Sequence, residues 1–189
     1  MMQTAQTTHR FTIDDYYRMY EAGVFAANQR VELIQGEIVD MSPIGSKHAR
    51  CVTKCDKEIQ VQLVKHDLMK RITVVVQNPL RLGPASEPQP DVMLVKEKDY
   101  SEQHPGPEDV LLVIEVADTS LEYDRNVKIP LYAQAGIPEV WLVALVDDCL
   151  FAYREPSHDG YRSIERLERG QIISPVALAQ IEIAINAVL

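Results

Sequence analysis

The sequence predicts an α/β (α+β) fold in a single domain. The length of 189 residues suits one domain with a core of useful size. Residues 110–117 contain seven apolar residues out of eight, many of them β-branched, which is typical of a strand covered on both faces. Residues 47–66 place apolar side chains at three- and four-residue spacing, which predicts a helix with one buried face. Strands and helices are therefore both expected around one core.

The N-terminal segment predicts a short helix after a polar tail. Residues 1–10 are polar, and we expect them to be disordered. Thr12 and Asp15 have the spacing of a capping box, so a helix begins here, and Gly23 is suited to end it.

Residues 31–41 predict a hairpin that turns at Gln35-Gly36, or else one long bent strand. Glu32 shares its side of this segment with Ile34 and Ile38 at a period of two. It is either an acid on a buried face or a hairpin-edge glutamate in water, and the pattern leaves both interpretations open.

Ser46 is placed to cap the long helix over residues 47–66. His48 lies at the inner end of the apolar stripe of this helix. A lone histidine there is usually a satisfied core or capping residue, but the loop before it leads from the Glu32 segment. His48 is therefore a candidate accessory residue of a site.

The rest of the chain is predicted to contain further strands and one further helix. Strands are predicted over residues 72–77, 90–95, 139–145, 150–154 and 161–167. A helix over residues 122–135 has Thr119 or Ser120 as its cap, and Pro130 predicts a kink or a two-part helix. The tail, residues 177–189, is helix or strand, with the alternation at 181–185 favouring a strand. We expect a core over residues 11–155 and a β-rich annex of the same domain over residues 156–189.

Composition excludes some classes of function. No apolar run of 18 residues and no basic-then-apolar leader are present, so we expect a cytoplasmic protein with no membrane association. The net charge of −9 is evidence against nucleic-acid binding through a surface covered in positive charge. A divalent metal could still bridge acidic residues to phosphate. Cys51, Cys55 and Cys149 lack the pairing of a zinc site and are expected to be buried thiols.

Two acids on predicted strands indicate a site. Asp91 opens one core strand, and Glu115 lies late in the apolar strand 110–117. A carboxylate buried there needs a cationic partner, which is a metal ion, a lysine, or both. Two carboxylates on neighbouring strands, with a backbone carbonyl between them, form a hard oxygen site suited to Mg²⁺ or Mn²⁺.

The same residues carry a family resemblance. Pro90-Asp91, followed by Glu115-Val116-Ala117 on the next strand, is similar to the PD-(D/E)XK pattern of restriction-endonuclease-like nucleases. The chain more closely resembles the bacterial "putative restriction endonuclease" family, formerly a domain of unknown function. The matching segments are residues 31–38, 76–79, 89–92, 114–120, 123–128 and 131–141.

This resemblance implies a mixed β-sheet flanked by helices, with the acids at one edge. It implies that Asp91, Glu115 and the carbonyl of Val116 hold Mg²⁺ or Mn²⁺, and that Glu32 is an accessory acid. It also implies DNA as the substrate and pairing into a homodimer. Gln77 could reach the site, and otherwise it is a hydrogen bonder at a strand end.

The chain departs from the superfamily pattern at one position. Ala117 stands where the motif has lysine, and the family resemblance transfers that role to Lys128 on the following helix. Asp124 lies four residues before Lys128, on the side that also carries Leu131 and Ala135. If Lys128 merely pairs with Asp124, the site lacks its cation.

Three functions remain open at this stage. The leading hypothesis is a Mg²⁺-dependent DNA endonuclease of the restriction type, with Asp91, Glu115, Lys128 and Glu32 as its catalytic residues. The second is a catalytically impaired nuclease-like module that binds nucleic acid or a protein. The third is an interaction protein whose acids belong to ordinary ion pairs. The target sequence and the biological role are not encoded in any recognisable motif.

Overall fold

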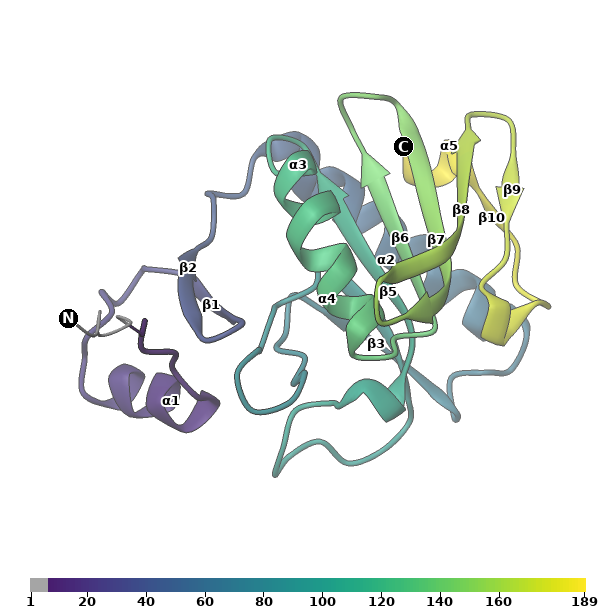
Figure 1. The fold of residues 1–189 in the computed structure, drawn as a ribbon. Helices are drawn as coiled ribbons and strands as arrows, with labels where there is room; N and C mark the ends of the chain where they lie inside the picture. The colour runs from purple at the N-terminus through teal and green to yellow at the C-terminus, as the bar shows by residue number, and fades with distance from the viewer. Residues whose placement is uncertain (1–6) are drawn as a thin grey trace.

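A computed structural model describes residues 7–189 as a mixed sheet covered by helices on both faces (Figure 1). Within this part of the chain, the main sheet has six strands in the order β3-β4-β5-β6-β7-β8. Their bounds are Ile72–Val76, Val92–Lys96, Val110–Ala117, Glu139–Ala144, Cys149–Ser157 and Gly160–Glu168. Only the β5–β6 pair is parallel among these neighbours, and the others are antiparallel. The predicted α/β (α+β) class with a helix-flanked mixed sheet is confirmed.

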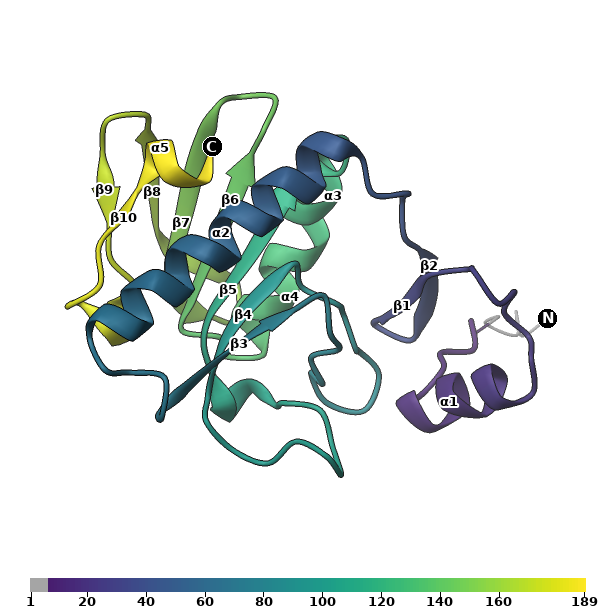
Figure 2. The same ribbon diagram turned by 180° about the vertical axis from the view of Figure 1, so that it is seen from behind.

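Helix α2 (Ser46–Lys65) covers one face of the sheet, as Figure 2 shows from behind. Its stripe of Val52, Cys55, Ile59 and Leu63 is buried against alternate residues of β4 and β5. The helix begins one residue earlier than predicted. Gly45, whose carbonyl accepts the N–H of Ala49, is the N-cap, and Ser46 is already helical and makes no side-chain cap.

The opposite face is covered by a helix in parts. These are α3 (Leu121–Tyr123), a π-helical turn (Asp124–Lys128) and α4 (Ile129–Gln134). The N–H of Ile129 bonds to the carbonyl of Asp124, five residues back, and Pro130 falls in the first turn of α4. The predicted two-part helix is confirmed. Ser120, one of the two predicted caps, is the N-cap residue of α3, but its side chain does not cap the backbone because the hydroxyl donates to the Asp124 side chain, at 2.6 Å.

The N-terminal helix and hairpin lie together to one side of the sheet (Figure 1). Thr12 and Asp15 form the predicted capping box of α1 (Ile13–Glu21). Strands β1 (Val31–Ile34) and β2 (Glu37–Asp40) pair around Gln35-Gly36, where both residues have positive φ, so the hairpin is confirmed over the bent strand. We expected residues 1–10 to be disordered, and residues 1–6 of this segment lie outside the described residues.

The C-terminal residues complete the far edge of the sheet. Strand β8 pairs with β7, and a separate short ribbon joins β9 (Ile172–Ile173) to β10 (Ile183–Ala184). The tail, predicted as helix or strand, contains both. The 3₁₀ turn Val176–Leu178 precedes the strand β10, and helix α5 (Ile185–Val188) follows it. A further 3₁₀ turn, Pro107–Asp109, precedes β5. The boundary at residue 155 stays a prediction.

The structure also bears on the cysteines and on the length and polarity of the helices. The three cysteines are buried free thiols, as predicted. Across residues 7–189, every helix is too short or too polar to span a bilayer.

Candidate metal and nuclease site

Strand register brings Asp91 and Glu115 to one edge of the sheet. Val92 pairs with Ile114 across the antiparallel β4 and β5, so Asp91 and Glu115 are the next residues outward on their strands. The backbone N–H of Gln77 bonds to the carbonyl of Asp91, which ties the end of β3 to the same edge. Three neighbouring strands therefore present side chains from one edge, as the resemblance implied.

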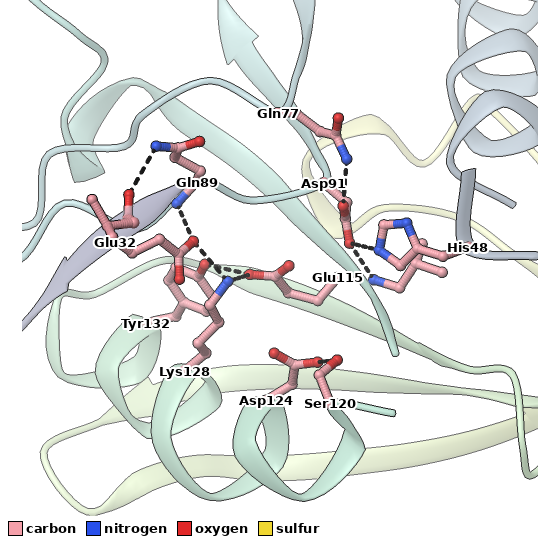
Figure 3. Close-up of polar contacts among 12 residues, drawn as sticks. Glu32, His48, Gln77, Gln89, Asp91, Glu115, Ser120, Asp124, Lys128 and Tyr132 are labelled. Atoms are coloured by element: carbon pink, nitrogen blue, oxygen red, sulfur yellow. Dashed lines mark hydrogen bonds and ion pairs between the residues drawn. The ribbon is translucent and has the colours of Figure 1, made fainter. Parts of the chain in front are cut away.

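Asp91 is fixed by three hydrogen bonds (Figure 3). Its Oδ2 accepts the backbone N–H of Val116 at 2.9 Å and lies 3.0 Å from Nε2 of His48. Its Oδ1 accepts from the side chain of Gln77 at 3.1 Å. His48 and Gln77 are therefore hydrogen-bond partners of Asp91, and their role as accessory residues of a site stays a prediction.

Glu115 lies in a second group, with Lys128 and Tyr132. Its Oε1 is 3.2 Å from Nζ of Lys128 and accepts the Tyr132 hydroxyl at 2.6 Å. All three side chains are buried. Both contacts involve Oε1. The other oxygen, Oε2, has no hydrogen-bond partner within residues 7–189, so it could accept another ligand.

Glu32 reaches the same lysine from β1. Its Oε1 is 3.0 Å from Nζ of Lys128 and accepts the backbone N–H of Gln89 at 2.6 Å. Glu32 is 2% exposed, so the interpretation as a hairpin-edge glutamate in water is wrong. The N–H of Glu87 also bonds to the carbonyl of Leu33, which fastens the hairpin to the loop before β4.

Within the described residues, the ion pairs of Lys128 are with Glu32 and Glu115. Asp124 lies beside this group and, in this part of the chain, forms no ion pair with Lys128. Its side chain accepts the Ser120 hydroxyl instead. The alternative that Lys128 merely pairs with Asp124 is therefore wrong, and the lysine faces the acids.

The electrostatics of the site follow from burial and from the crowding of acids. Burial raises the pKa of Glu115 to about 8, against the opposing effect of Lys128. Burial also works against the charge of Lys128, but Glu115, Glu32 and Asp124 outweigh it and raise the lysine pKa. The hydrogen bond to Asp91 raises the pKa of His48, although burial opposes that shift. The site is an acidic cluster that holds one buried ammonium and favours a further cation.

These residues line one cleft, called here the acidic cleft, with a volume of about 410 Å³. Its wall includes Glu32, His48, Gln77, Asp91, Glu115, Val116, Tyr123, Asp124 and Lys128. Asp91 and Glu115 therefore share a cleft, which the hypothesis of a two-carboxylate site requires.

The donor set of the acidic cleft fits a hard divalent cation. Among residues 7–189, no three side chains of the types His, Cys, Asp and Glu cluster closely enough to form a metal cage. A site with two carboxylates and one backbone carbonyl needs no such cage, because Mg²⁺ usually keeps several of its waters. The carboxylates of Asp91 and Glu115 and the backbone carbonyl of Val116 are oxygen donors of the type that such a coordination uses.

Some residues of the site were not predicted from the sequence. Tyr132 lies four residues after Lys128, so helical spacing could have indicated it, but the predicted face continued through Leu131. The backbone contact from Gln89 to Glu32 has no signal in the sequence. Tyr123 falls in a segment that matches the family, but no pattern in the sequence marks it as a site residue, and it lines the cleft.

The fold and the acids at the sheet edge define a restriction-endonuclease-like α/β domain. The profile of the Uma2 family, described as putative restriction endonuclease, matches residues 13–186, and the chain belongs to this family. No curated protein matches the chain. Among solved structures, it is similar to a putative nuclease of the family DUF820 from Anabaena variabilis ATCC 29413, with a TM-score of 0.70 and 15% identity. That match covers 94% of this chain and 97% of the other, and it supports the fold.

Proposed function

We propose that this protein is a Mg²⁺- or Mn²⁺-dependent endonuclease that hydrolyses phosphodiester bonds of DNA. The observation that carries the proposal is the acidic cleft, where Asp91 and Glu115 meet on neighbouring strands and Lys128 is buried against Glu115. Membership of a family described as putative restriction endonuclease supports the same reaction class.

In this proposal, Asp91, Glu115 and the Val116 carbonyl hold the metal. When bound, the ion supplies charge neutralisation at the phosphate and activation of the attacking water. Val116, His48 and Gln77 fix the orientation of the Asp91 carboxylate through their hydrogen bonds, as outer partners of metal ligands do.

Lys128 takes the role that the motif gives to a lysine two positions after the glutamate. Its ammonium is held between Glu32 and Glu115, and the raised pKa keeps it charged. It is therefore suited to stabilise negative charge that develops on the phosphate, and not to act as a base. Glu32 acts as an accessory acid that positions Lys128.

DNA with two strands favours two sites, so we propose that the protein acts as a homodimer. Light scattering of the full chain measures the oligomeric state directly, and a monomer at working concentrations would contradict this part of the proposal.

A second candidate is a nuclease-like module that binds nucleic acid or a protein partner without cutting. Ala117 at the usual lysine position and the net charge of −9 favour it. The two functions differ in turnover, so a cleavage assay separates them.

The test is nicking of supercoiled plasmid DNA by purified protein with Mg²⁺ or Mn²⁺. We expect nicking by the wild type, none in EDTA, and none by Glu115→Ala. Asp159→Ala, which changes a fully exposed acid in the β7–β8 turn, is the matched control and should nick normally. Equal nicking by Glu115→Ala would reveal a contaminating nuclease and contradict the proposal.

A further inference from the structure

The hydroxyl of Tyr123 is buried and has no hydrogen-bond partner in residues 7–189, and Tyr123 is one of the residues that line the acidic cleft. Tyr123 is the last residue of α3, directly before the π turn that carries Lys128. A buried hydroxyl normally finds a partner, because leaving it unpaired loses the hydrogen bonds it made to water. This exception therefore needs an explanation.

Unpaired buried polar atoms are rare in the described residues. Within the described residues, three buried side-chain atoms lack a partner, namely Nδ1 of His48, Oε1 of Gln62 and the hydroxyl of Tyr123. Two of these three residues line the acidic cleft. By contrast, Tyr132 and Tyr161 have partners for their hydroxyls, in Glu115 and in the carbonyl of Ile137. Tyr123 thus differs from these two tyrosines, because it lines the cleft and its hydroxyl is unpaired within the described residues.

Charged side chains act on the Tyr123 hydroxyl. Burial and then the charge of Glu32 raise the pKa of Tyr123, and Lys128 lowers it. The hydroxyl is a donor, since burial raises the pKa of Tyr123 to about 12. In protein–DNA contacts, donors of this kind bond mainly to phosphate oxygens, which are the strong acceptors that DNA carries.

We propose that the Tyr123 hydroxyl donates a hydrogen bond to a non-bridging oxygen of the DNA phosphodiester in the acidic cleft. The proposal rests on the proposed function, because it assigns a further contact to the same substrate. Tyr123 and Lys128 then hold the phosphate from the helical side of the cleft, opposite the strand edge that carries Asp91. Tyr123 is a catalytic residue in the sense that it touches the substrate.

The test compares Tyr123→Phe with Tyr161→Phe, which removes a hydroxyl that has a partner outside the cleft. Three quantities are measured: the melting temperature without metal, the affinity for Mn²⁺, and the binding of a fluorescein-labelled duplex oligonucleotide. DNA binding is measured by anisotropy in a Glu115→Gln background, so that it is scored without cleavage. The nicking rate of each single variant is measured separately.

For Tyr123→Phe, we expect DNA binding and nicking to weaken by about tenfold or more, as for a hydrogen bond to a charged group. The melting temperature should stay unchanged or rise, and the affinity for Mn²⁺ should stay unchanged. Tyr161→Phe should show the reverse, with a lower melting temperature and unchanged DNA binding.

Three results would overturn the inference. Unchanged DNA binding by Tyr123→Phe removes the phosphate contact. A lowered melting temperature without metal means that the hydroxyl has a partner within the chain. A loss of Mn²⁺ affinity that matches the loss of DNA binding assigns the hydroxyl to the metal site. Absence of nicking by the wild type contradicts the proposed function instead, and the binding comparison still decides the role of Tyr123.

Discussion

The ammonium nitrogen of Lys128 lies 3.2 Å from Oε1 of Glu115, although the motif would place a lysine at position 117. Ala117 is fully buried on β5, in the cluster that packs beneath α4. A long charged side chain at that position would have to fit into this packed layer. The helix that covers the layer provides the cation instead, and the π turn that ends at Lys128 brings the ammonium to the acids.

Replacement of Lys128 by methionine should reduce both stability and activity. The change leaves Glu32 and Glu115 buried without their cation, and breaking a buried pair typically costs about 3–5 kcal/mol in the free energy of unfolding. Urea denaturation at pH 9, above the pKa of Glu115, measures this loss, and the plasmid assay should show no nicking. The control is Lys57→Met on the exposed side of α2, which should be near neutral. A Lys128→Met protein with wild-type stability would contradict the buried ion pairs.

His48 and Gln77 should contribute to metal affinity without coordinating the metal. Both bond to Asp91, and loss of such an outer partner typically lowers metal affinity by about 10–100-fold. We therefore expect His48→Ala and Gln77→Ala to weaken Mn²⁺ binding in a calorimetric titration. His66→Ala, at the far end of α2, is the control. Equal affinity in all variants would mean that Asp91 needs no positioning.

Metal affinity should rise with pH up to about 8. The pKa of Glu115 is about 8 because the carboxyl is buried, so below that pH a proton competes with the cation for the carboxylate. Mg²⁺ affinity should therefore increase by up to about tenfold per pH unit below pH 8 and level off above it. Titrations across this range measure the trend, and Glu115→Gln should lack it. A flat profile in the wild type would exclude Glu115 as a ligand that must lose a proton.

Not every buried acid belongs to the acidic cleft. Glu139 is fully buried on β6, where it accepts from Trp141, Arg154 and the backbone N–H of Val176. It fastens the C-terminal tail to the sheet, so Glu139→Ala should cost about 3 kcal/mol of unfolding free energy while the remaining folded protein still binds metal. Glu165→Ala, which removes the exposed partner of Arg154, should cost less than about 1 kcal/mol in the same denaturation experiment. Equal losses would contradict this distinction.

Much of the fold could be predicted from local patterns. The run at 110–117 became β5 with the same bounds, and the stripe of α2 is buried as its spacing indicated. Caps were less predictable, because Ser120 has a nearby side-chain partner in Asp124 that competes with the backbone. The tail was undecided because its elements are short, and contacts such as that of Val176 with Glu139 hold them in place.

The sequence indicated most of the residues that gather in the acidic cleft, but not the contacts between them. The apolar strands around them indicated Asp91 and Glu115, and the family resemblance supplied the role of Lys128. The contact between Glu32 and Lys128 joins residues 96 positions apart, and only the packing of the hairpin against the sheet brings it about. The partner of Tyr132 and the unpaired hydroxyl of Tyr123 are likewise consequences of tertiary packing.

The most direct test of the metal site is a crystal of this protein soaked in Mn²⁺, with the anomalous scattering of manganese used to locate the ion. The account predicts one strong peak in the acidic cleft, within coordination distance of carboxylate oxygens of both Asp91 and Glu115. A peak bound by neither carboxylate, or an acidic cleft that stays free of manganese at saturating concentration, would contradict it.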